Sequence, residues 1–142
     1  DKTAASMQAL GNIKLASGEY DEAEKWLGQA LAIIEQLGTS EEARASILDS
    51  LGACSNLRGD QQTALERMRK AMLIRQEQLG DEHPLIARSQ HNLAVVLLEH
   101  GQVDEAVDLL ETAKTTLVRA FGADHPETVA VAKKLESART RQ

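Results

Sequence analysis

Apolar and polar residues follow a helical period along most of the chain, in blocks that end at regularly spaced glycines. Three long apolar-periodic runs end in a hydrophobic residue and a glycine, at steps of 42 residues: Leu37-Gly38, Leu79-Gly80 and Phe121-Gly122. A second set of glycines recurs at steps of 41 and 42: Gly18, Gly59 and Gly101. Two recurrent periods in register indicate an internal repeat rather than unrelated helices.

Each repeat unit is predicted to be a pair of antiparallel helices. The first helices are expected near 3–17, 42–58 and 84–100, and the second helices near 20–37, 61–79 and 103–121. A seventh helix is expected near 126–140. The fold class is therefore all-α, an α-solenoid of three helix pairs plus a C-terminal capping helix. We predict a single repeat domain over 1–142, with repeats at about 3–38, 42–80 and 84–122.

The predicted helix boundaries carry recognisable end signals. The second set of glycines falls at the turn inside each pair, where a left-handed residue closes a helix. Pro84 and Pro126 fit the first position of a helix, where a missing N–H has no cost. Thr39-x-x-Glu42 and Asp124-x-x-Glu127 resemble capping boxes at matching places.

Small residues mark the predicted contact between the two helices of a pair. Gly11, Gly52 and Ala94 occupy one position of the first helices, and alanines recur on the facing side of the second helices. Trp26 is interpreted as a packing residue rather than a ligand anchor. The seventh helix carries Glu136 at the small-residue position, so we expect it to cap the array.

Composition narrows the function. Aromatic residues make up only 2% of the chain, and the net charge of −6 argues against nucleic-acid binding. The single Cys54 cannot form an intramolecular disulfide, and no apolar run approaches the length of a membrane span. These features favour the cytoplasm. The chain begins at Asp1 without a Met, so it could be a fragment with repeats missing upstream.

The residues resemble those of a known family. The pattern of Leu10, Gly11, Gly18, Tyr20 and Ala23 resembles the tetratricopeptide repeat. The 42-residue unit is more particular, because Leu-Gly-Asp-Glu-His-Pro (79–84) and His-Asn-Leu-Ala (91–94) resemble the repeats of kinesin light chains and related proteins. The resemblance covers essentially the whole chain. It implies a protein- or peptide-binding scaffold in which the first helices line a concave groove.

The resemblance also implies which residues face that groove. The candidate peptide-binding residues are Asn12, Asp49, Asn56, Arg88, His91, Asn92, Val95, Lys133 and Lys134. An asparagine side chain suits the backbone of an extended peptide, although Asn12, Asn56 and Asn92 could also be ordinary solvated residues. Arg88, Lys133 and Lys134 could hold an acidic peptide. The two lysines could equally serve only to solubilise the last helix.

Catalytic and metal-binding patterns are not found in the sequence. The histidines His83, His91, His100 and His125 lack zinc-ligand spacing, and no phosphate-binding glycine loop is present. His83 and His125, which precede prolines, are expected in structural turns. A clamp for a C-terminal carboxylate, known from chaperone-binding members of the family, is not expected, because Gln8, Ser50 and Asn92 depart from its pattern.

We therefore expect a non-catalytic scaffold, without cofactor or metal, that holds an extended and acidic peptide in its groove. Asn12, Arg88 and Asn92 are the expected anchors. The alternative is a structural module of a larger protein that self-associates through its N-terminal helix pair. Neither nucleic acid nor membrane is expected as a partner.

Overall fold

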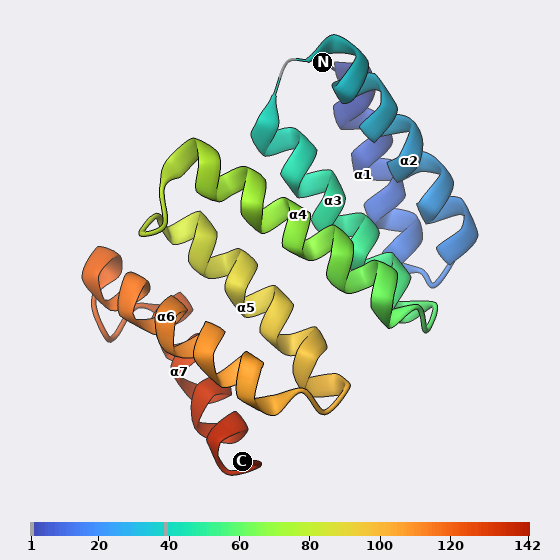
Figure 1. Ribbon diagram of the computed structural model, residues 1–142. Helices are drawn as coiled ribbons and strands as arrows, with labels where there is room; N and C mark the ends of the chain where they lie inside the picture. The colour runs from blue at the N-terminus through green and yellow to red at the C-terminus, as the bar shows by residue number, and fades with distance from the viewer. Residues whose placement is uncertain (1, 39) are drawn as a thin grey trace. The chain divides into compact units, whose positions relative to one another are not determined.

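The computed structural model describes residues 2–38 and 40–142, which form seven α-helices and no strands (Figure 1). The helices are Lys2–Ala16 (α1), Tyr20–Leu37 (α2), Glu41–Leu57 (α3), Gln61–Leu79 (α4), Pro84–Glu99 (α5), Val103–Phe121 (α6) and Pro126–Arg139 (α7). The all-α fold class, with three helix pairs followed by a further helix, is confirmed. Every predicted boundary lies within about one residue of the observed one.

The helices divide into two compact units, residues 1–74 and 75–142, and the division falls inside α4. Unit 1 contains α1, α2, α3 and most of α4. Unit 2 contains the last turn of α4 together with α5, α6 and α7. Each unit is described separately below.

The turns inside the helix pairs have the predicted backbone. Gly18, Gly59 and Gly101 have φ values of 82°, 87° and 78°, in the left-handed region that glycine enters without a steric penalty. At the first of these turns, the N–H of Glu19 donates to the carbonyl oxygen of Lys14 at 2.9 Å, which satisfies an end carbonyl of α1.

The start of α3 is capped by Ser40. Its hydroxyl oxygen accepts a hydrogen bond from the backbone N–H of Ala43 at 3.1 Å. Thr39, to which the sequence pattern assigned this role, lies outside the described residues.

The capping box predicted from Asp124 and Glu127 is wrong, because histidines cap α5 and α7 instead. Nδ1 of His125 accepts from the backbone N–H of Glu127 at 3.1 Å, and Nδ1 of His83 accepts from the N–H of Leu85 at the same distance. Each histidine precedes a proline, which holds it in extended backbone and places its ring beside the first free N–H of the helix. The structural turn role predicted for the two histidines is confirmed.

Unit 1 is built on close approach between α1 and α2, and between α3 and α4. A Cβ added to Gly11 would lie only 2.6 Å from Cγ of Leu27, and one added to Gly52 would lie 2.8 Å from Cγ of Met68. Both large side chains are buried, so each glycine provides the space that its partner fills. The core of this region comprises Ala4, Ala23, Leu27, Ala30, Ile34, Ile47, Leu51 and Cys54.

A single arginine ties three helices of unit 1 together. Arg67 of α4 donates to both carboxylate oxygens of Glu24 on α2, at 2.7 and 3.2 Å. The same guanidinium donates to the hydroxyl of Ser55 and the carbonyl oxygen of Leu51, both on α3. Its half-buried charge is therefore paired and hydrogen-bonded, which removes most of the cost of its burial.

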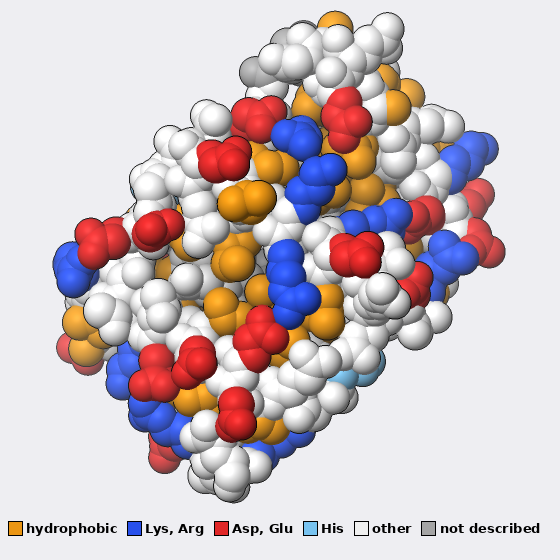
Figure 2. Space-filling model, viewed as in Figure 1, with side chains coloured by type: hydrophobic (Ala, Val, Ile, Leu, Met, Phe, Trp, Pro, Cys, Tyr) orange, Lys and Arg blue, Asp and Glu red, His pale blue; other side chains and the backbone are white. Residues whose placement is uncertain are grey.

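Unit 2 repeats the apolar contact with Ala94 of α5 in the small position, and it adds polar ties between its helices. Arg75 in the last turn of α4 donates to the buried hydroxyl of Ser89 on α5 at 2.5 Å. Beyond the end of α7, Arg141 donates to the carbonyl oxygen of Leu98 near the end of α5. Figure 2 shows that both signs of charge and small apolar areas are interspersed on the viewed face of each unit.

Because α1 and α2 are in close contact, replacing glycine by alanine is expected to have opposite effects on stability at Gly11 and Gly28. Gly11→Ala forces Leu27 to move and is expected to destabilise the fold by about 1 kcal/mol or more, despite the better helix propensity of alanine. Gly28→Ala, also mid-helix but with open space around the added Cβ, is expected to stabilise by about 0.5–1 kcal/mol. Urea denaturation of the two variants measures both shifts. Stabilisation by both substitutions would show that α1 and α2 are not closely packed.

Candidate functional site

The predicted groove residues fall into two groups, one in each unit. Asn12, Asp49 and Asn56 lie on α1 and α3 of unit 1. The other six lie on α5 and α7 of unit 2: Arg88, His91, Asn92, Val95, Lys133 and Lys134.

In unit 1 the neighbouring surfaces of α1 and α3 are partly occupied by contacts between the helices themselves. Nε2 of Gln8 donates to the hydroxyl oxygen of Ser46 at 2.9 Å. Asn12 is exposed on α1, whereas Asp49 and Asn56 are half-buried on α3. Of the three predicted residues, Asn12 is thus the most accessible to a ligand.

In unit 2 the corresponding helices, α5 and α7, enclose a cavity of about 310 Å³ together with α6. Its lining is mainly apolar, with an arginine, a histidine and a glutamate among small and branched side chains. The lining residues are Ala87, Arg88, His91, Leu117, Pro126, Glu127, Ala130 and Val131. The small side chains of Ala87 on α5 and Ala130 on α7 leave this space open. Pro126, at the start of α7, also lines it.

An ion pair spans the two helices at this cavity. Nε of Arg88 lies 2.7 Å from Oε1 of Glu127, with the arginine side chain 54% exposed and the glutamate 33% exposed. Because the contact uses Nε, the two Nη nitrogens of Arg88 are available to a second carboxylate. The remaining oxygen, Oε2 of Glu127, is buried and accepts no hydrogen bond within the described part of the chain. The pair therefore offers donors to an acidic group of a ligand.

His91 is the third polar group of the cavity. Burial lowers the pKa of its imidazole below the ordinary value, and the positive charge of Lys134 lowers it further. His91 is consequently neutral near neutral pH, with one ring nitrogen as donor and the other as acceptor.

Two of the nine predicted residues, Arg88 and His91, line this cavity. Lys134 is close enough to influence His91, but its neighbour Lys133 lines a different cavity with Ala132 and Glu136. Asn92 is exposed and Val95 half-buried on α5, and neither lines the cavity.

The sequence pattern missed Glu127 as a partner of Arg88. The pattern assigned the carboxylate of Glu127 to a capping box, so this residue was not considered as an ion-pair partner. A signal was nonetheless present, because the 42-residue repeat makes α7 the equivalent of α5 one repeat later. An acidic residue in the first turn of α7 was therefore a candidate partner for Arg88.

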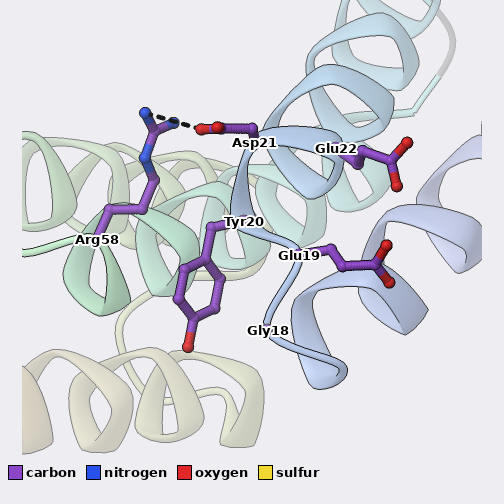
Figure 3. Close-up of a pocket in the computed structure, with 6 residues that line it drawn as sticks. All are labelled: Gly18, Glu19, Tyr20, Asp21, Glu22 and Arg58. Carbon is purple, nitrogen blue, oxygen red and sulfur yellow. Dashed lines mark ion pairs between the residues drawn. The ribbon is translucent and has the colours of Figure 1, made fainter.

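A larger cavity in unit 1, about 450 Å³, lies at the turn between α1 and α2 (Figure 3). Its carboxylates are already paired: Arg58 bridges Asp21 at 3.2 Å, and Lys14 bridges Glu19 at 3.3 Å and Glu22 at 3.1 Å. Two cations thus pair with three carboxylates, and each carboxylate already has a partner. We interpret the cavity as a solvated notch rather than a ligand site.

Catalytic and metal chemistry find no support at these sites. Burial and the nearby carboxylate of Glu24 raise the pKa of the Cys54 thiol, whose sulfur contacts the carbonyl oxygen of Tyr20 at 3.4 Å. Such a thiol is a poor nucleophile. Among residues 2–38 and 40–142, no three His, Cys, Asp or Glu side chains gather closely enough to hold a metal ion. None of the described helices combines the length and apolar character of a membrane span.

Comparison with known proteins identifies the repeat. A family model described as tetratricopeptide repeat matches residues 2–72 and again 44–117. The clustered mitochondria protein homolog of Homo sapiens is 28% identical over 118 residues, which is 82% of this chain but 9% of that protein. The kinesin light chain-related protein 2 of Arabidopsis thaliana is 24% identical over 92% of this chain and 20% of its own length. The chain thus corresponds to a small part of each of these relatives.

Solved structures agree with the family model. Nearly identical TPR-like repeats of a Podosopora anserina kinesin light chain superpose with a TM-score of 0.85 at 30% identity, over 96% of this chain and 65% of theirs. The secretion chaperone SycD of Yersinia enterocolitica, in complex with a peptide of the translocator YopD, shares the fold at 20% identity. Its TM-score is 0.71, over 99% of this chain and 95% of that chain.

Folds of this kind typically mediate protein–protein interactions and generally act as non-catalytic scaffolds. The matching family model, the Podosopora repeats and the Arabidopsis relative all agree on the repeat subtype. This chain belongs to the tetratricopeptide repeat family, with repeats of the kinesin-light-chain-like type.

Proposed function

We propose that the chain is a non-catalytic scaffold that binds an extended, acidic peptide, and that the cavity between α5 and α7 of unit 2 is the principal contact. The observation that carries this proposal is the combination of an apolar space of about 310 Å³ with Arg88, Glu127 and His91 at its lining. Binding pockets typically pair an apolar lining with a few polar groups that orient the ligand.

The chemistry of the three polar groups specifies the peptide. An apolar side chain fills the cavity, and a neighbouring acidic side chain pairs with the Nη nitrogens of Arg88. Glu127 pairs with Nε of Arg88 and so leaves the Nη nitrogens for that acidic side chain. Asn92, exposed on α5, contributes hydrogen bonds to the peptide backbone.

The SycD complex supports a peptide ligand only in general terms, because its likeness to this chain extends to the fold alone. It shows that a protein of this fold accepts a peptide. The choice of an acidic peptide rests on Arg88, Lys134 and the cavity described above.

A second candidate function is self-association through the N-terminal helix pair. The large apolar side chain of Ile13 on α1 is 63% exposed, and burial in a dimer would remove that area from water. This candidate requires no peptide ligand.

Arg88→Gln is expected to weaken binding of an acidic peptide about tenfold, because one charge-assisted contact is lost. The probes are short synthetic peptides with one apolar residue between glutamates, measured by fluorescence anisotropy. Arg58→Gln is the matched control, since Arg58 is also a surface arginine in an ion pair but lies away from the cavity. Equal losses in the two variants, or no loss in either, would remove Arg88 from the binding site.

Binding of the same peptide is expected to strengthen as the pH falls. The pKa of His91 in the free protein lies below its ordinary value of 6.5. A bound carboxylate favours the protonated ring and raises this pKa, so binding takes up a proton. Affinity therefore rises as the pH falls through the interval between the bound and free pKa values. Titrations at about pH 7.5, 6.5 and 5.5 should show this gain in the wild type and not in His91→Gln. The same pH dependence of affinity in the wild type and in His91→Gln would contradict this role of His91.

Self-association makes a different prediction. Light scattering should then show a dimer that dissociates on dilution, and Ile13→Asp should yield a monomer at all concentrations, because an unpaired charge is costly to bury. A wild-type chain that stays monomeric at every concentration would exclude self-association and would leave the peptide-binding proposal unaffected.

A further inference from the structure

The side of α7 that faces away from the α5–α7 cavity forms, together with α6, a second depression. Two cavities of about 480 and 310 Å³ lie there. Both are lined by Lys114, Leu135 and Arg139, so they join into one trough between the two helices. We call this surface the α6–α7 trough. Its remaining lining residues are Glu111, Thr115, Val118, Arg119, Ala123, Val129, Ala132, Lys133 and Glu136.

The middle of the trough is apolar. Leu135 is nearly buried at 2% exposure, whereas Val118 on α6 remains 40% exposed. Val129 and Ala132 of α7 are half-buried beside them. An elongated apolar strip between two helices has the shape that a third helix fills.

The internal repeat supports a helix as the occupant. In α5 the residues Ala94 and Leu97 are fully buried, and α6 packs closely against that helix. At the positions 42 residues later, α7 carries Glu136 and Arg139, both exposed. This side of α7 therefore corresponds to the side of α5 against which α6 packs. Where α5 has the buried apolar residues Ala94 and Leu97, α7 has exposed charged residues. An occupant must accordingly carry charges of its own.

The charges of the trough select an acidic occupant. Four cationic side chains line it against the two carboxylates of Glu111 and Glu136, in a chain whose net charge is −6. Arg139 is already bridged to Glu111 at 3.3 Å. Lys114, which is half-buried, and Lys133, which is exposed, form no ion pair with any residue that the structure describes. These two lysines line the same cavity as Glu136, so the unpaired charges there are two cations against one carboxylate.

We propose that the α6–α7 trough docks an acidic amphipathic helix of a partner protein. The apolar stripe of that helix covers Val118, Val129 and Ala132, and carboxylates on its flanks pair with Lys114 and Lys133. This surface is separate from the peptide cavity, which is lined by Glu127, Ala130 and Val131 of the same helix α7. The chain thereby holds two ligands of different form, an extended peptide and a helix.

Three helical peptides test the proposal. They share one apolar stripe at positions i, i+3, i+4 and i+7 and differ only in acidic, neutral or basic flanks. Fluorescence anisotropy with the intact chain should give the order acidic, neutral, basic in decreasing affinity. The double substitution Lys114→Glu, Lys133→Glu should weaken the acidic helix about tenfold or more. Lys70→Glu, on an exposed site of α4, is the control and should change the affinity by less than about twofold.

Several outcomes would overturn the proposal. Equal binding of the three peptides would show apolar adhesion without charge selection, and failure of all three to bind would show that no helix docks. A dimer that the double substitution dissociates would make a second copy the occupant. Arg88→Gln should leave the acidic helix unaffected, and an equal loss there would place the helix in the peptide cavity instead.

Discussion

The structure depends on close contact between the two helices of each pair. In unit 1 this contact requires glycine at 11 and 52, because Leu27 and Met68 occupy the space in which a Cβ would stand. The side chains of Leu27 and Met68 bury apolar area against these glycines and fix the register of each pair. The first helices also carry exposed polar and charged residues, among them Asn12 on α1 and Arg88 on α5.

Two partly buried charged groups, Arg67 and Glu127, differ in how fully they are hydrogen-bonded among the described residues. Arg67 makes four hydrogen bonds to three side-chain or carbonyl partners across α2 and α3. Glu127, by contrast, has one oxygen paired with Arg88 and one buried without a hydrogen bond among the described residues. A half-satisfied carboxylate is costly to bury, and the ion pair with Arg88 offsets part of that cost.

Helix positions and turns could be predicted from the sequence because they depend on local signals. The glycines require left-handed backbone, the prolines mark helix starts, and the apolar period gives the faces. The site could be predicted only in part, because it depends on contacts between segments far apart in the chain. Asp124 matched the pattern of a cap, but His125 takes that role since the following proline orients its ring. The pairing of Arg88 with Glu127 joins residues 39 apart, beyond any local pattern.

Lys133 and Lys134 show why adjacency in sequence does not place two residues in one site. Successive residues of a helix point about 100° apart, so a helix with two open sides can assign neighbours to different surfaces. Lys134 influences His91 on the side of the peptide cavity, whereas Lys133 lines the α6–α7 trough with Glu136. The sequence grouped the two lysines either as contacts for one acidic peptide or as solubilising residues of the last helix. The helix α7 therefore carries one lysine toward each of two surfaces. A charge change at Lys134 should affect binding at the peptide cavity, and one at Lys133 should affect binding at the α6–α7 trough.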